Sequence, residues 1–159
     1  MLQKCRKMLR NEKGLTLIEL LAVVVILGII AAIAIPSIGG LIDNSKKDAH
    51  VANAQQMASA ARLAITGLSD ATGSYNISLE YLQDNDFIET MEDPDGGSYS
   101  QGTGQDPMND TTGSYVVVSS GKVTAVKLVN GTRGVQLSTG TPKGPVLIED
   151  LKRQEVRAN

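Results

Sequence analysis

The sequence predicts an α+β fold in which a long N-terminal α-helix packs on a small antiparallel β-sheet of about three strands. Three features support this prediction. The chain has an apolar run from Leu15 to Ile35, a stripe of small apolar residues spaced three or four apart within 51–68, and two β-branched runs within 114–129. A chain of 159 residues has room for one small domain besides such a helix.

The apolar run has the length and composition of a membrane-spanning helix. Its 21 residues are all Leu, Ile, Val, Ala or Gly except Thr16 and Glu19. At about 1.5 Å per residue, a helix of this length reaches roughly 30 Å, which is the thickness of the hydrocarbon core of a bilayer. We therefore expect this segment to lie in a membrane.

A basic segment, residues 1–14, precedes the run. It carries five basic residues and one acidic residue, Glu12, so the positive-inside rule places it in the cytoplasm and the C-terminus outside. Without this segment the chain keeps 10 of its 15 Lys and Arg and 16 of its 17 Asp and Glu, which gives a side-chain charge of −6. Because such an acidic chain is repelled by phosphates, we expect no direct nucleic-acid binding. The only cysteine, Cys5, also lies there, so the remainder can form no disulfide.

Glu19 is an acid in apolar surroundings and needs a partner. An ionised side chain within a membrane helix costs about 3 kcal/mol even on permissive scales. One interpretation is that Glu19 reaches the headgroups, since it lies near the cytoplasmic end. The other is that cleavage after Gly14 creates the cation, because the new α-amino group of Leu15 would lie one turn before Glu19 or face Glu19 of a neighbouring copy.

The N-terminal sequence resembles that of type IV prepilins and the related pseudopilins. The resemblance rests on GLTLIELL at 14–21, on Gly28, and on AAIAIP at 31–36, which ends at Pro36. It implies that a prepilin peptidase cuts between Gly14 and Leu15 and methylates the Leu15 amino group. It also implies that Glu19 aligns an incoming subunit with the Leu15 amine of its neighbour. Most family members have Phe where this chain has Leu15.

The resemblance implies a structural subunit, or pilin, of a type IV pilus or pilus-like filament, assembled from the cytoplasmic membrane and then exposed at the cell surface. The alternative is a pseudopilin of a competence DNA-uptake or type II secretion system. The implied partners are further copies in a helical filament, the prepilin peptidase and methyltransferase, a membrane assembly platform with its motor ATPase, and lipid before assembly. The expected pilin-like organisation is a cleaved leader (1–14), a transmembrane and filament-core helix (15–36), an amphipathic continuation of the helix (37–68), a globular α+β headgroup (69–148) and a charged C-terminal tail (149–159).

Two residues mark a weak section of the helix. Pro36 lacks a backbone N–H, and Gly28 lowers helix propensity. The resemblance implies that the helix partly unwinds between them in a filament, and a continuous helix with a gentle bend is the alternative. Farther along, small residues allow close approach of a sheet, whereas a coiled coil is the other interpretation of the stripe. The stripe consists of Val51, Ala54, Ala58, Ala61, Ile65 and Leu68.

The sequence offers few metal ligands and little catalytic chemistry. His50, the only histidine, has no Cys or His near it, so we expect a solvated or packed neutral side chain. The polar loop over 92–113 contains four calcium candidates, but the Asp-x-Asp-Gly pattern lacks the third acid and distal Glu of an EF-hand, which favours a turn. We expect no cofactor, with calcium as the alternative, and no enzyme, since phosphate loops and catalytic triads are missing. The calcium candidates are Asp93, Asp95, Asp106 and Asp110.

The headgroup should contain one short helix and a β-hairpin. Ser78 is placed to cap a helix that begins at Leu79. The runs 114–119 and 122–129 flank Ser-Gly, which predicts a hairpin, and 132–138 would add a third strand. Residues 146–148 form either an edge strand or the start of a helix.

Two other classes of protein share parts of this pattern. Ala32-Ile33-Ala34 could end a secretory signal, but the run is longer than such signals and contains Glu19. A single-span anchor for a sensor or enzyme domain would keep its leader. The mature N-terminus distinguishes the three classes.

Overall fold

The structure is a computed structural model that describes the backbone of residues 2–67, 73–102, 112–140 and 142–159, with helix side chains from residue 16 onward. The chain divides into two compact units, Met1–Asp43 and Asn44–Asn159. One helix, α1 (Leu2–Gly67), contributes to both units. Each unit is described separately below.

The first unit is helical throughout and presents an apolar surface. Every large apolar side chain from Leu17 to Ile42 is more than half exposed. Among the described residues, the segment Thr16–Gly67 of α1 is the one helix that is long and apolar enough to cross a membrane, judged by length and composition. Pro36 lies within the helix, which stays continuous there.

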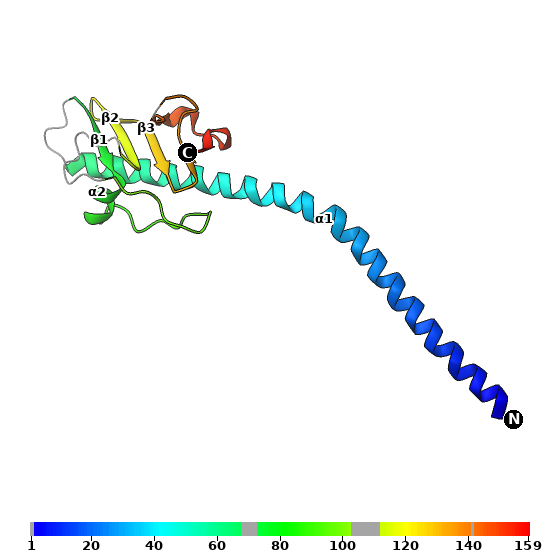
Figure 1. Ribbon diagram of the computed structural model, residues 1–159. Helices are drawn as coiled ribbons and strands as arrows, with labels where there is room; N and C mark the ends of the chain where they lie inside the picture. The colour runs from blue at the N-terminus through cyan, green and yellow to red at the C-terminus, as the bar shows by residue number, and fades with distance from the viewer. Residues whose placement is uncertain (1, 68–72, 103–111, 141) are drawn as a thin grey trace. The chain divides into compact units, whose positions relative to one another are not determined.

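The second unit contains an antiparallel sheet beside the C-terminal half of α1 (Figure 1). The strand order is β1-β2-β3-β4-β6, and β5 pairs with β3. All five pairings are antiparallel. The strands are β1 (Ser74–Ser78), β2 (Tyr115–Ser119), β3 (Lys122–Val129), β4 (Arg133–Val135), β5 (Val146–Leu147) and β6 (Val156–Ala158).

The helix covers the sheet through the predicted small-residue stripe. Ala54, Ala58 and Ala61 are buried, while Val51 and Ile65 are partly buried. Ala54 and Ala61 belong to one hydrophobic core with strand residues, and Val51 and Ile65 pack against it. Leu68, the last member of the stripe, lies outside the described residues. Met57 is the one large α1 side chain among the fully buried residues that the structure describes in this core, and the small residues around it allow close packing. The α+β layout predicted from the sequence is therefore confirmed. The strand residues in this core are Tyr75, Ile77, Val116, Val118, Val126, Leu128, Val135, Val146 and Val156.

The hairpin and the short helix also form where the sequence predicted them. Ser120 and Gly121 connect β2 to β3 with φ values of 51° and 71°, the left-handed pair that a two-residue hairpin turn requires. Helix α2 (Leu79–Asp84) begins after Ser78, whose Oγ accepts a hydrogen bond of 3.1 Å from the Tyr81 N–H. The cap fixes the direction in which the chain leaves β1.

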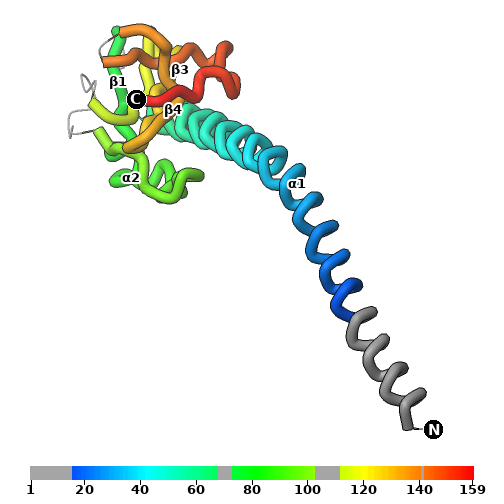
Figure 2. Tube along the Cα trace, turned by 45° about the vertical axis from the view of Figure 1, so that its right-hand side comes forward, coloured from blue at the N-terminus to red at the C-terminus, as the bar shows by residue number. Residues whose placement is uncertain are grey.

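The sheet has six strands, so the expected number of about three was too low. No strand was expected before Ser78, but Tyr75 and Ile77 alternate inward and make β1. It treated 149–159 as a charged tail, but Val156 is buried and β6 pairs with β4, so the C-terminus lies beside β4 in Figure 2.

The remaining C-terminal residues form short 3₁₀ turns between the last strands. Residues 146–148 combine both expected forms, since β5 ends at Leu147 and the 3₁₀ turn η1 (Ile148–Asp150) follows at once. A second 3₁₀ turn, η2 (Arg153–Glu155), leads into β6.

Candidate functional site

The first candidate site is the N-terminal part of α1. Gly14, Leu15 and Glu19 all have helical backbone, and four residues in a helix make about one turn, so Leu15 and Glu19 share a face. The Glu19 side chain is exposed, and it takes part in none of the ion pairs among the described side chains. Its neighbours Ile18 and Leu20 are 59% and 67% exposed. Glu19 is thus a carboxylate on a surface built from apolar side chains.

The glycines of this segment are not required by packing within the chain. A Cβ atom added at Gly28 or at Gly39 would meet no atom within 4 Å. The effect of Gly28 in a single chain is therefore limited to the intrinsic preference of the helix backbone. The predicted unwinding between Gly28 and Pro36 concerns the assembled filament and stays a prediction.

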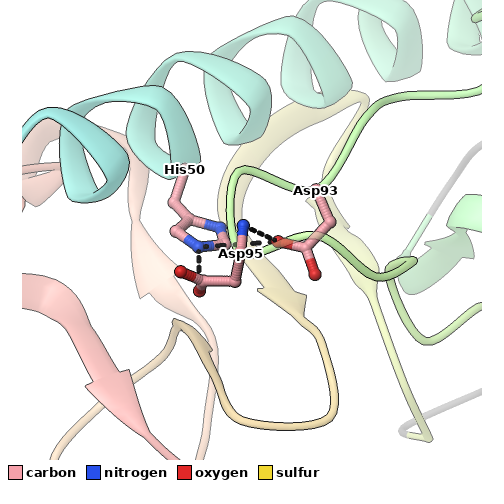
Figure 3. Close-up of side chains that lie close together, drawn as sticks. All are labelled: His50, Asp93 and Asp95. Atoms are coloured by element: carbon pink, nitrogen blue, oxygen red, sulfur yellow. Dashed lines mark hydrogen bonds and ion pairs between the residues drawn. The ribbon is translucent and has the colours of Figure 1, made fainter. Parts of the chain in front are cut away.

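The second candidate site is a group of polar side chains in the second unit. We call it the Asp95 cluster, and it consists of Asp95 with His50, Asp93, Asn130 and Arg133. His50 extends from α1 toward the loop that carries the two aspartates (Figure 3). Its Nε2–H donates to Asp95 Oδ2 over 3.0 Å, and its side chain is fully buried. His50 is thus packed rather than solvated.

Asp95 is held by cations from two different elements. Arg133 of β4 donates through Nε and through a terminal nitrogen to the two oxygens of Asp95, each over 2.6 Å. Lys46 of α1 lies 3.6 Å from the same carboxylate. These hydrogen bonds, from Arg133 first and then from His50 and Asn130, hold the pKa of Asp95 far below its usual range, although partial burial opposes the shift.

Tyr99 completes the hydrogen bonds of His50. Asn53 Nδ2 donates to the Tyr99 hydroxyl over 2.9 Å, which leaves the hydroxyl hydrogen to donate to His50 Nδ1 over 2.9 Å. Burial is the main reason why the pKa of Tyr99 is raised to about 12, and the charges of Asp93 and Asp95 add to it. Both nitrogens of the His50 imidazole therefore have a hydrogen-bond partner.

The cluster also brings together three groups that could bind a metal. One ligand atom from each of His50, Asp93 and Asp95 lies within 4.8 Å of the others. However, both Asp95 oxygens accept from Arg133, and the guanidinium charge would repel a metal ion at this position. The geometry fits a network of ion pairs better than a cation site.

The calcium candidates fall into two groups. Asp93 Oδ1 accepts from the Asp95 N–H over 3.0 Å, and its Oδ2 accepts from Asn130 Nδ2 over 2.7 Å. Asp93 and Asp95 therefore form the predicted turn, and Gly96 follows it with a φ of 87°. Asp106 and Asp110 lie outside the described residues.

The Asp95 cluster was not predicted from the sequence, because His50, the loop and β4 are far apart in the chain.

Comparison with known proteins bears on the first candidate site. Residues 9–35 match the family model described as the prokaryotic N-terminal methylation motif. No curated protein and no solved structure matches the chain. The match includes Gly14, Leu15, Glu19 and Gly28, and it overlaps the part of α1 whose large apolar side chains are exposed from Leu17 onward. The chain therefore carries, at its N-terminus, the class III signal of type IV prepilins and pseudopilins.

Proposed function

We propose that this protein is a structural subunit of a type IV pilus or pilus-like filament, matured by cleavage between Gly14 and Leu15. The observation that carries the proposal is the methylation motif on a helix whose large apolar side chains are exposed. A second unit with its own buried core supplies the headgroup. The exposed helix needs lipid before assembly and other helices after it, since water would not stabilise such a surface.

Glu19 has a specific role in this proposal. Cleavage gives Leu15 a positive α-amino group, which the peptidase methylates and which keeps its charge. The Glu19 carboxylate of an incoming subunit pairs with the Leu15 amine of its neighbour, and this pairing offsets the cost of a charge in an apolar environment, about 3 kcal/mol. The exposed position of Glu19 leaves its carboxylate available to a second copy.

The proposed topology follows from the charge of the two ends. The leader, residues 1–14, stays in the cytoplasm, and 15–36 cross the membrane or form the filament core. Residues 37–68 carry the helix into the headgroup, which lies outside together with 149–159. Lipid, the prepilin peptidase, the assembly platform with its motor ATPase and further copies of the chain are the proposed partners.

The mature N-terminus tests the processing step. We expect intact-mass analysis of the protein from its native host to give a chain that begins at N-methylated Leu15. A chain beginning at Met1 would indicate a membrane anchor, and one beginning at Ile35 would indicate a secretory signal. Either result would refute the proposal.

The assembly step is tested with Glu19→Ala. We expect normal cleavage and normal amounts of membrane-inserted subunit, but at least tenfold fewer sheared fibres, because a loss of about 1.4 kcal/mol per contact already lowers an association constant tenfold. Glu89→Ala removes an exposed headgroup carboxylate and is the matched control. Wild-type fibre yield from Glu19→Ala would exclude the pairing. Imaging of the fibres, with motility and transformation assays in a deletion strain, distinguishes a long pilus from a pseudopilus.

A further inference from the structure

A pocket of about 450 Å³ lies beside β3 in the second unit and adjoins the Asp95 cluster at Asn130, which lines both. Its described lining includes two lysines, Lys127 and Lys143, and apolar groups from Val129 and Pro142. No Asp or Glu side chain is among the described lining residues. The pocket therefore combines positive charge with apolar walls.

Lys127 is a buried cation, and no carboxylate in the described part of the chain pairs with it. Only 6% of the residue is exposed, and it takes part in no ion pair or hydrogen bond with the described side chains. Its Nζ lies 5.7 Å from the centre of the Tyr115 ring. Such a contact contributes about 0.5–2 kcal/mol, which is less than the several kcal/mol that removing an ammonium group from water costs. Burial accordingly lowers the pKa of Lys127.

The other polar groups of the pocket leave room for one small anion. Lys143 Nζ donates to the carbonyl oxygen of Ala158, so two of its three N–H groups remain. The amides of Asn130 and Gln136 already donate to Asp93 and to the carbonyl of Ala158. The remaining N–H groups of the two lysines are thus the donors left for an anion, and the apolar side chains of Val129 and Pro142 beside them suit a carboxylate on an apolar group better than a free phosphate.

We propose that this pocket binds a carboxylate carried on an apolar group, with its oxygens between Lys127 and Lys143 and its apolar part against Val129 and Pro142. The carboxylate can come from a free small molecule or from an acidic side chain of a second copy of the chain. The second source rests on the proposed filament, whereas the first does not.

Binding is tested on the full chain in detergent micelles, with benzoate as the probe and chloride replacing it at constant ionic strength. We expect a saturable change in the NMR signals of the Lys127 Cε–H₂ group and a benzoate-dependent rise in melting temperature. Lys127→Met should abolish the benzoate-dependent rise in melting temperature and, because it removes a buried charge, should itself raise the melting temperature measured without benzoate. Lys143→Met should weaken binding about tenfold, the loss expected for one charge-assisted contact.

Two variants act as controls. Lys122→Met removes an exposed lysine from the same strand and should bind benzoate as the wild type does. Lys127→Arg keeps the charge and should retain part of the binding. The proposal is refuted if benzoate produces no saturable change in the wild type, or if Lys127→Met responds in the same way as the wild type.

A second measurement distinguishes the two sources. In fibres, a carboxylate from a neighbouring subunit would already occupy the pocket. The NMR signal of the Lys127 Cε–H₂ group would then have the chemical shift of the bound state, and benzoate would not change it. A free ligand as the natural occupant would leave the fibre signal responsive. Because binding in micelles needs no fibre, failure of assembly would refute the proposed function and leave the pocket intact.

Discussion

At the scale of single residues, Asp95 connects three separate parts of the headgroup. Asp95 accepts from His50 on α1 and from Arg133 on β4 at the same time. A single carboxylate therefore fixes the loop to the helix on one side and to the sheet on the other.

Asp95→Asn should destabilise the headgroup. The substitution removes the negative charge that Arg133 and Lys46 contact at this position, and we expect the free energy of unfolding to fall by about 2 kcal/mol, as for hydrogen bonds to charged groups. Thermal unfolding followed by near-ultraviolet circular dichroism measures this, since all four tyrosines (Tyr75, Tyr81, Tyr99 and Tyr115) lie in the second unit. Asp48→Asn breaks an exposed pair with Arg153 and is the control, with little change expected. Equal effects from the two variants would contradict the role of Asp95.

The same carboxylate makes stability depend on pH in a defined direction. The folded-state pKa of Asp95 is lowered, so its stabilising effect is complete above the unfolded-state pKa, about 3.9, and is lost as the pH falls from there toward the folded-state value. We expect the difference in melting temperature between wild type and Asp95→Asn to be constant from pH 7 to 5 and to shrink below pH 4. A difference that stays the same down to pH 2 would show that the ionised form of Asp95 is not what stabilises the loop.

At the scale of secondary-structure elements, β3 and β4 lie very close together at Gly134. A Cβ atom at this position would lie 2.2 Å from the Leu128 carbonyl oxygen and 2.5 Å from the Val129 Cα. Both are backbone atoms of β3, which cannot rotate away as the end of a side chain would. The pairing of β4 with β3 therefore requires glycine at 134.

Gly134→Ala should separate these strands. We expect a loss of about 1–3 kcal/mol in stability, the usual cost of overpacking, together with weaker amide protection of β4 and β6 in hydrogen exchange. Gly131→Ala, where an added Cβ meets no atom within 4 Å, is the matched control. If both variants lose the same stability, the close approach is not what matters.

Local patterns in the sequence were sufficient to predict the structural features that depend on residues close together in the chain. The β2–β3 hairpin, the α2 cap and the small-residue face of α1 each depend on residues a few positions apart. Strand β6 has only three residues, one of which is Arg157, and its pairing with β4 connects segments that no local pattern relates. The Asp95 cluster escaped prediction for the same reason, since His50 and Asp95 are 45 residues apart.

At the scale of the whole molecule, the two units differ in whether they bury their apolar side chains. The second unit buries them in its own core, while the first exposes them along α1. The sequence predicted a long apolar segment in α1, because an uninterrupted apolar run is a strong and local signal. It could not predict the contacts of α1 in a filament, since those depend on neighbouring copies.

The interval from Gly28 to Pro36 should set how far fibres extend. We expect Gly28→Ala and Pro36→Ala fibres, pulled by atomic force microscopy, to lengthen less than wild type at the same force, because both substitutions favour the helix over its unwound form, Ala over Gly by about 1 kcal/mol. Gly39→Ala is the control, as it makes the same chemical change outside the interval. Equal extension of all these fibres would place the weak section elsewhere.

The Asp95 cluster holds its loop in place through ion pairs and hydrogen bonds. No sulfur atom takes part in it, because the single cysteine of the chain is Cys5. Reductants such as dithiothreitol should leave the loop attached, whereas concentrated salt and strong acid should loosen it. In a fibre of such subunits, the loop held by the Asp95 cluster would stay the same in aerobic and anaerobic surroundings, because the cluster contains no thiol or disulfide.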